Sequence, residues 1–404
     1  MTFATRLKLS VMMFLEYFVW GAWYVTTSTY LTETLKFSGA QVGVIYGTTA
    51  LAGMISPFFV GMVADRFFAT QHMLAFLHLV GGLILFYASS LTSFGPLYSV
   101  LLVYTLFYMP TMALTNSLSF RQMTDPGREF PGVRVLGTIG WIVAGLIVGF
   151  LGLEATAQPM RLAALASVIF GLYSLVLPHT PPAKLGHRPT FGDVIGLDAL
   201  RLMKERSFAI FALGSFLICI PLQFYYTFTN PFLNDIGVVN AAGKMTMGQM
   251  SEIFFMLVMP WFFKRLGVKY MLLVGMGAWV ARYLMFAFGD NQALVWMLYL
   301  GIILHGICYD FFFVTGQIYV DSKAPGDLRA AAQGFVYFLT YGAGMFVGSW
   351  ICGVVVDTFS TTGPAGVVHA WRQIWMVPAA GAAVVLLLFM LFFKNEKVEA
   401  PVTK

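Results

Sequence analysis

The sequence predicts an all-α membrane protein with twelve transmembrane helices, and two observations carry this prediction. Of the 404 residues, 59% are hydrophobic and only 10% are charged, whereas a soluble domain has about 25% charged residues. Apolar runs long enough to cross a bilayer, about 20 residues each, recur along the whole chain. The predicted spans are 9–30, 40–63, 73–92, 96–119, 132–153, 160–178, 208–229, 246–263, 268–289, 293–319, 330–356 and 371–393.

Lysine and arginine are distributed unevenly among the connections. Eighteen of the 24 lie in the N-terminus, in the connections after even-numbered spans or in the C-terminus, and four lie in the opposite connections. The positive-inside rule therefore predicts that both termini are cytoplasmic, which agrees with an even number of spans. The net charge of +6 then reflects topology and the anionic headgroups of the lipid bilayer. No nucleic-acid partner is expected.

A polar segment divides the chain near its middle. Residues 179–206 separate six predicted spans from six more, so we expect an N-terminal half at 1–178, a cytoplasmic linker at 179–206 and a C-terminal half at 207–404. A weak repeat agrees, because Pro57-Phe58-Phe59 and Pro260-Trp261-Phe262-Phe263 each precede a basic connection. Two related six-helix halves describe the major facilitator fold. The segment Gly61-Met62-Val63-Ala64-Asp65-Arg66 also resembles part of that superfamily's signature.

The motifs of soluble enzymes are missing from the sequence. It has no phosphate-cradling G-x-x-x-x-G-K-[ST] loop, no G-x-S-x-G elbow and no H-E-x-x-H pair. The three cysteines lie in apolar spans without metal-ligand spacing. We therefore expect no enzymatic activity, no catalytic residues, no metal and no cofactor.

Three carboxylates lie inside apolar runs, where acidic side chains are rare: Glu16, Glu252 and Asp310. On insertion scales a charged side chain near the centre of a span costs about 2.5–3.5 kcal/mol. Such residues persist where they bind a substrate or relay protons. These three acids are therefore the first candidates for a functional site.

The first acid shares a helix face with two indoles. Glu16, Trp20 and Trp23 follow the i, i+4, i+7 spacing. A carboxylate beside indoles can take up a proton and can stack a planar or sugar ligand. The alternative is a protonated Glu16 that is hydrogen-bonded to a neighbouring helix, with Trp23 as an interfacial anchor.

The second acid has an amide on the same helix face. Gln249 and Glu252 are three residues apart, and together they can grip vicinal hydroxyl groups, because both accept hydrogen bonds and the amide also donates. The alternative is an internal polar network that fixes this span against its neighbours. The cost of a glutamate at this depth favours a binding site.

The third acid follows a histidine and a tyrosine. His305 and Tyr309 have i, i+4 spacing, and Asp310 comes next. Desolvation of Asp310 could suit it to carry protons. The alternative is an ion pair that locks this span, with His305 a satisfied core residue. Arg282, midway through its own span, is one candidate partner for an acid.

Two more helix faces carry polar and aromatic side chains. Arg134, Thr138 and Trp141 follow the i, i+4, i+7 spacing. Arg134 is close enough to the membrane surface to extend to the headgroups, and the alternative is that it pairs with Asp310 or Glu252. Gln223 and Tyr226 share a face after Pro221, which interrupts the regular helix. Both faces are candidate ligand surfaces.

These residues also carry a resemblance to the nucleoside–proton symporter family of the major facilitator superfamily, and it runs from the first predicted span to the last. The polar anchors match, while Glu16, Trp141, Tyr226, His305 and Tyr309 replace glutamine, phenylalanine, asparagine, tyrosine and phenylalanine of well-studied members. The matching segments are Trp20-Gly21-Ala22-Trp23, Tyr108-Met109-Pro110-Thr111, Phe130-Pro131 through Arg134, Gly137-Thr138-Ile139-Gly140, Gln249 through Glu252, Asp310-Phe311-Phe312 and Arg329-Ala330-Ala331-Ala332-Gln333-Gly334.

The resemblance implies a monomeric importer in the bacterial inner membrane that binds a nucleoside between its halves. Our hypothesis is that the proton gradient drives alternating access, with Asp310 as the main proton carrier, Arg134 modulating it and Glu16 as a candidate second carrier. By resemblance, Arg134, Thr138, Gln223, Gln249, Glu252 and Asp310 coincide with residues that the family uses for binding or coupling. The full predicted substrate-binding set is Arg134, Thr138, Trp141, Gln223, Tyr226, Gln249, Glu252, His305, Tyr309 and Trp20, and the predicted proton-coupling set is Asp310, Glu252 and Glu16.

More specific roles follow as a hypothesis. Glu252 and Gln249 would bind ribose hydroxyls, Gln223 would contact ribose or base, and Trp141, Tyr309 or Trp20 would stack on the base. A symporter or facilitator for a sugar or another polyhydroxylated solute is one alternative. A membrane receptor that binds a nucleoside without transporting it is another.

Overall fold

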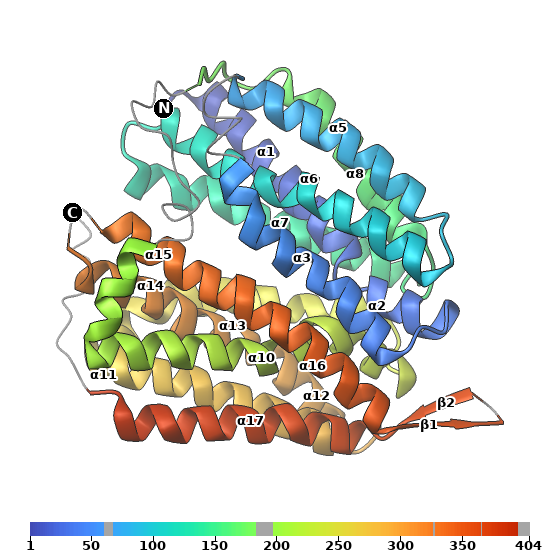
Figure 1. Cartoon of the computed structure of the whole chain (residues 1–404). Coiled ribbons are helices and arrows are strands. Elements are labelled where there is room, and N and C mark those ends of the chain that lie inside the picture. Colours follow the sequence, from blue (N-terminus) through green and yellow to red (C-terminus); the bar gives the residue numbers. More distant parts are fainter. Residues whose placement is uncertain (60–67, 183–196, 326–327, 365, 395–404) are drawn as a thin grey trace. The chain divides into compact units, whose positions relative to one another are not determined.

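A computed structural model describes residues 1–59, 68–182, 197–325, 328–364 and 366–394. The segment 61–66 lies outside the described residues, and so does the middle of the predicted linker 179–206. The predicted all-α character is confirmed, because nearly every described residue outside the connections is helical (Figure 1).

The first half of the chain forms long apolar helices. α6 and α7 each contain a proline, at Pro110 and Pro131, which neighbouring helices make tolerable in a membrane span. The elements are α1 (Phe3–Trp23), α2 (Thr27–Thr29), η1 (Tyr30–Thr34), α3 (Gly39–Phe59), α5 (Thr70–Ala88), α6 (Phe94–Arg121), α7 (Pro126–Phe150) and α8 (Gln158–Ser174).

The second half is also helical, and two of its spans contain a π-helical segment, η4 and η5. Such segments within helices often mark functional sites. The elements are η3 (Leu197–Lys204), α10 (Arg206–Asp235), α11 (Ala241–Phe288), α12 (Val295–Ile303), α13 (His305–Tyr309), η4 (Asp310–Val314), α14 (Thr315–Lys323), α15 (Arg329–Tyr337), η5 (Phe338–Gly344), α16 (Met345–Thr358), β1 (Ser360–Gly363), β2 (Gly366–His369) and α17 (Trp371–Phe392).

Every predicted span overlaps a helix. Helix α11 covers two of them, and at Gly267 its backbone leaves the helical region (φ 66°, ψ 177°) between the two predicted segments. Among the described residues, nine helices are long and apolar enough to cross a membrane. The membrane-protein fold is therefore confirmed, while the number of twelve crossings stays a prediction.

The described residues form two compact units. One holds most of the first half of the chain together with Asn240–Thr246, and the other holds most of the second half together with Ser38–Gly43. In the first unit, α1 packs on α7 and α8, and α5 packs on α6 and α8. Its core includes Leu9, Leu74, Leu114 and Phe170, which come from α1, α5, α6 and α8.

The second unit has an aromatic core where α10, α11 and α17 meet. The ring of Phe232 lies 5.3 Å from Trp371 and 5.4 Å from Trp375, and the ring of Tyr283 stacks on Trp375 at 5.9 Å. Aromatic pairs at these separations add to the free energy gained by burial. This core holds α10 and α11, which supply several predicted site residues.

A β-hairpin extends from the end of α16 (Figure 1). Strands β1 and β2 are antiparallel, with Ser360 opposite His369 and Thr362 opposite Val367. Both His369 and Trp371 hydrogen-bond to the Asp235 carboxylate at the end of α10. The sequence predicted only a connection here, between the spans 330–356 and 371–393.

Candidate functional site

The predicted residues of the second unit gather around His305. Its imidazole stacks on the phenol ring of Tyr225, with ring centroids 5.1 Å apart and 18° between the planes. Its Nε2 atom lies 3.9 Å from Oε2 of Glu252. His305 is buried and Glu252 is partly exposed. Glu252 therefore lies beside a buried histidine that is stacked on an aromatic ring, a neighbour that helix spacing did not predict.

Arg282 lies beside Tyr225, the ring on which His305 stacks. Its guanidinium carbon is 4.1 Å from the centroid of the Tyr225 ring, and its Nε atom donates to the carbonyl oxygen of Gly301 at 3.1 Å. The two terminal nitrogens have no hydrogen-bond partner among the described residues. The structure thus forms a cation–π contact in place of the hydrogen-bonded acid pair considered from the sequence. Arg282, Tyr225, His305 and Glu252 are called the His305 cluster below.

Close helix packing holds the His305 cluster together. The Ser251 hydroxyl donates to the carbonyl oxygen of Ile303 at 2.6 Å and accepts from the backbone N–H of Gly306 at 3.0 Å. A Cβ atom at Gly306 would lie 2.6 Å from the Ser251 backbone. Small residues let helix backbones approach in this way. This contact fixes the spacing between Glu252, on α11, and His305, on α13.

Asp310 begins the π-helical segment η4. Its side chain is fully buried, and neither carboxylate oxygen has a hydrogen-bond partner among the described residues. Asp310 interacts electrostatically with Glu252. Its neighbour Tyr309 is half-buried and accepts a hydrogen bond from the Tyr341 hydroxyl at 3.1 Å. A buried acid in this setting has the features of a proton-binding group.

The remaining predicted residues of this unit lie on α10 and α11. Gln223 is buried, and its Nε2 atom donates to the Thr227 hydroxyl at 3.1 Å, while its Oε1 atom has no partner among the described residues. Tyr226 packs edge-on against His305 with centroids 6.1 Å apart. Gln249 is half-buried on the helix face that also carries Glu252.

The first unit holds the other predicted residues. Trp20 and Trp141 pair with ring centroids 5.8 Å apart. The guanidinium carbon of Arg134 lies 3.9 Å above the Tyr17 ring, so the structure shows a cation–π contact where the sequence suggested extension to headgroups. Trp20, Trp141, Arg134 and Thr138 are all half-buried, as expected of side chains that line a surface.

Glu16 is enclosed by neighbouring helices. Its carboxylate accepts from the Thr111 hydroxyl at 2.8 Å and hydrogen-bonds to Nε2 of His78 at 3.2 Å. The other ring nitrogen of His78 bonds to Ser167 at 3.0 Å. This is the hydrogen-bonded alternative considered for Glu16. Trp23 is buried against Tyr104, so the idea that Trp23 anchors the interface is wrong.

Three contributors were missed by sequence reasoning. His78 was not singled out, although a histidine in an apolar span is a signal of the same kind as a buried acid. Tyr225, which directly precedes Tyr226, was not proposed as a site residue, and Tyr341 was not considered. Their partners lie far along the chain, so spacing could not reveal them. Among the described residues, no group of three or more His, Cys, Asp or Glu side chains could hold a metal ion.

Comparison with known proteins gives a consistent result. The family model described as "Nucleoside H+ symporter" matches residues 3–398. The candidate nucleoside transporter YegT of Escherichia coli (strain K12) is 42% identical, over 99% of this chain and 96% of that protein. The xanthosine permease of the same organism is 37% identical, over 98% and 96%. The crystal structure of the nucleoside transporter NupG matches with a TM-score of 0.89 and 32% identity, covering 97% of this chain and all of that one.

Proposed function

The chain belongs to the nucleoside H+ symporter family, and we propose that it imports nucleosides by alternating access with protons moving in the same direction. It is a membrane transporter and not an enzyme. The observation that carries the proposal is a set of buried polar atoms in the second unit without hydrogen-bond partners among the described residues. Those near His305 and Asp310 include Oε1 of Gln223, the Tyr225 hydroxyl, Nδ1 of His305 and both carboxylate oxygens of Asp310.

These atoms favour a polar ligand with both donors and acceptors. Buried polar groups in proteins are almost always hydrogen-bonded, and a concentration of exceptions is typical of a ligand or water site. Aromatic rings of Tyr225, Tyr226 and Tyr309 lie among them. A nucleoside combines a planar base with a polyhydroxylated ribose, so it matches aromatic faces and polar groups together.

We assign ribose binding to Glu252 and Gln249, with Gln223 contacting ribose or base. A carboxylate and an amide on one helix face can accept from, and donate to, neighbouring hydroxyl groups. The partial exposure of Glu252 and Gln249 supports this role. Base stacking is assigned to Tyr309, Trp141 or Trp20. Thr138, Tyr226 and His305 complete the proposed binding set.

We assign proton coupling to Asp310, with Arg134 modulating it. Neither carboxylate oxygen of Asp310 has a hydrogen-bond partner among the described residues, and Asp310 interacts electrostatically with Glu252. Loss or gain of a proton at Asp310 therefore changes the environment of the proposed ribose ligand. Glu16 differs, because Thr111 and His78 already engage both of its carboxylate oxygens. The role of second proton carrier suggested for Glu16 by the sequence is therefore the alternative that a Glu16→Gln variant tests.

Uptake into proteoliposomes tests this function. An inward proton gradient should drive accumulation of labelled nucleoside, and unlabelled nucleosides should compete for uptake. Glu252→Gln should raise the apparent dissociation constant roughly 10- to 150-fold, because a hydrogen bond to a charged group contributes about 1.5–3 kcal/mol. Glu205→Gln is the control, since Glu205 is exposed and pairs with Lys323.

Two alternative functions give different results in the same assay. Competition by free sugars but not by nucleosides would indicate a transporter of sugars or other polyhydroxylated solutes. Saturable nucleoside binding without counterflow of labelled nucleoside would indicate a receptor. The cytoplasmic location of both termini, the bacterial inner membrane and the monomeric state belong to the proposal as well.

A further inference from the structure

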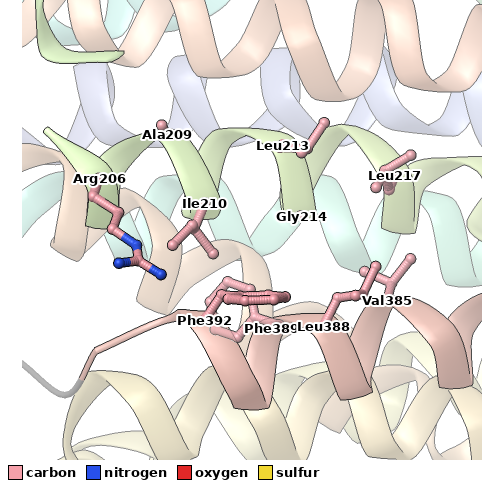
Figure 2. Close-up of a pocket in the computed structure, with 10 residues that line it drawn as sticks. All are labelled: Arg206, Ala209, Ile210, Leu213, Gly214, Leu217, Val385, Leu388, Phe389 and Phe392. Atoms are coloured by element: carbon pink, nitrogen blue, oxygen red, sulfur yellow. The ribbon is translucent and has the colours of Figure 1, made fainter. Parts of the chain in front are cut away.

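An apolar groove lies between α10 and α17 of the second unit (Figure 2). Its volume is about 380 Å³. All of its lining side chains are apolar except that of Arg206, which lies at the end where α10 begins and α17 ends. The lining residues are Arg206, Ala209, Ile210, Leu213, Gly214, Leu217, Val385, Leu388, Phe389 and Phe392.

Small residues on α10 create this groove. Gly214 lets the ring of Phe389 lie against the α10 backbone, since a Cβ atom at this position would come within 2.9 Å of the ring. Phe389 is buried and forms the floor, whereas Leu213, Leu388 and Phe392 remain exposed and form the rims. The groove is therefore a feature of helix packing, with its open side toward the surroundings of the unit.

The length of the groove fits one leaflet of a bilayer. Residues 206–217 of α10 span about 16 Å, at about 1.5 Å per residue. Half of a hydrocarbon core of about 30 Å is about 15 Å. The volume also falls within the range of about 300–1,000 Å³ that is typical of ligand pockets. A single acyl chain lying along α10 would match both dimensions.

Positive charge gathers at the Arg206 end. The Arg206 guanidinium extends over this end toward Phe392 (Figure 2), and it forms no hydrogen bond or ion pair with another described residue. Lys394 is exposed just beyond α17, and Lys269 donates to the carbonyl oxygen of Met390 at 3.1 Å. The neighbouring acid Glu205 is already paired with Lys323. The net charge of the side chains at this end of the groove is therefore positive, which favours an anionic ligand group.

We propose that the α10–α17 groove binds one acyl chain of an anionic phospholipid, with the lipid phosphate paired to Arg206. Apolar side chains along one leaflet accept the chain, and a guanidinium presents paired donors to phosphate oxygens. Basic residues next to apolar spans attract anionic lipids in this way. This site is independent of the proposed transport site.

Native mass spectrometry of the full chain in detergent tests the proposal. Phosphatidylglycerol and phosphatidylcholine with identical acyl chains would be titrated separately. We expect phosphatidylglycerol to bind at least fivefold more tightly, and Arg206→Gln to reduce that preference about fivefold, the factor expected from one basic side chain near the surface. Arg201→Gln is the matched control, because Arg201 is exposed and contacts Asp198 of its own helix.

A second variant tests the acyl chain. Ala209→Trp should fill the groove and lower binding of both lipids, while Leu257→Trp, at a 76% exposed site on α11, should not. Excess glycerol 3-phosphate should not displace the lipid, because it has the charge without the chains. Equal binding of the two lipids by the unmodified chain, or equal effects of Arg206→Gln and Arg201→Gln, would overturn the proposal. So would unchanged lipid binding in a folded Ala209→Trp protein.

Discussion

The imidazole of His305 lies against the ring of Tyr225, 5.1 Å from centroid to centroid and nearly parallel to it. The Arg282 guanidinium forms a cation–π contact with the Tyr225 ring, and Nε2 of His305 lies 3.9 Å from Oε2 of Glu252. A fully buried arginine is thereby connected through two stacked rings to the proposed ribose ligand. Arg282 is linked to Glu252 through these two rings, so we regard it as a positioning residue.

Replacing Arg282 should weaken nucleoside binding without abolishing folding. A desolvated cation–π contact contributes about 2 kcal/mol, so Arg282→Met should raise the dissociation constant up to about 30-fold. Arg282→Lys should recover part of the affinity, because it keeps the charge but loses the planar stacking surface. Titration calorimetry with the purified protein measures both effects.

A cation–π contact at the surface supplies the control for Arg282. The Arg372 guanidinium carbon lies 4.7 Å from the Phe288 ring, and Arg372 is exposed. Arg372→Met should leave the dissociation constant unchanged, since exposed contacts of this kind contribute little. If Arg282→Met bound nucleoside as tightly as Arg372→Met did, the positioning role of Arg282 would be ruled out.

Asp310→Asn should separate transport from proton coupling. The amide cannot carry a proton through the cycle, so a pH gradient should no longer drive accumulation. With one proton per nucleoside, one pH unit can support about a tenfold concentration ratio, and in the variant this ratio should fall to about one. Counterflow of labelled nucleoside should persist, because exchange does not require net proton movement.

The neighbouring Asp321→Asn tests whether this effect is specific to Asp310. Asp321 lies on α14, further along the same stretch of helices, but it is exposed and contacts Arg329. Full accumulation is expected in this variant. Full pH-driven accumulation in Asp310→Asn proteoliposomes would contradict the assignment of Asp310 as proton carrier.

Hydropathy and spacing predicted the helices well, because each is defined by residues that are local in sequence. The helical repeat alone was enough to predict that Gln249 and Glu252 share a helix face. The partner of Arg282 could not be predicted, since the choice between an acid and the Tyr225 ring depends on how α10 and α11 pack. The π-helical start at Asp310 departs from the 3.6-residue repeat on which the prediction relied.

Two further features show the same limit. The hairpin between α16 and α17 has a glycine on each side of its turn, Gly363 at the end of β1 and Gly366 at the start of β2, yet strands this short give little alternating pattern. The bond between Glu16 and His78 joins residues 62 positions apart. A single sequence contains no measure of that distance, so Glu16 had two open interpretations until the structure supplied its partners.

The hydrogen bonds of Glu16 with Thr111 and His78 should contribute more to the stability of the fold than to proton coupling. Removing one member of a buried pair costs about 3–5 kcal/mol, so Glu16→Ala should markedly lower the thermal unfolding midpoint. Glu16→Gln should retain most of the stability, because an amide can still bond to Thr111 and His78. pH-driven accumulation should also persist in Glu16→Gln. Its loss, with counterflow intact, would instead identify Glu16 as a second proton carrier.

The glycine at 306 should be needed for the distance between Glu252 and His305. A Cβ atom there would lie 2.6 Å from the Ser251 backbone. This clash cannot be relieved by rotating a side chain, because the contacted atoms belong to the backbone. Gly306→Ala should therefore force α13 away from α11 and cost about 1–3 kcal/mol. We expect weaker nucleoside binding and a lower unfolding midpoint together.

Gly277→Ala on α11 is the matched control for this change. Nothing lies within 4 Å of a Cβ atom at that position, and alanine in a helix is favoured over glycine by about 1 kcal/mol. This variant should be as stable as the unmodified chain or slightly more so, with normal binding. Differential scanning fluorimetry and titration calorimetry on both variants compare the two effects. Normal affinity in Gly306→Ala would show that the spacing set by the Ser251 contact does not control the ligand site.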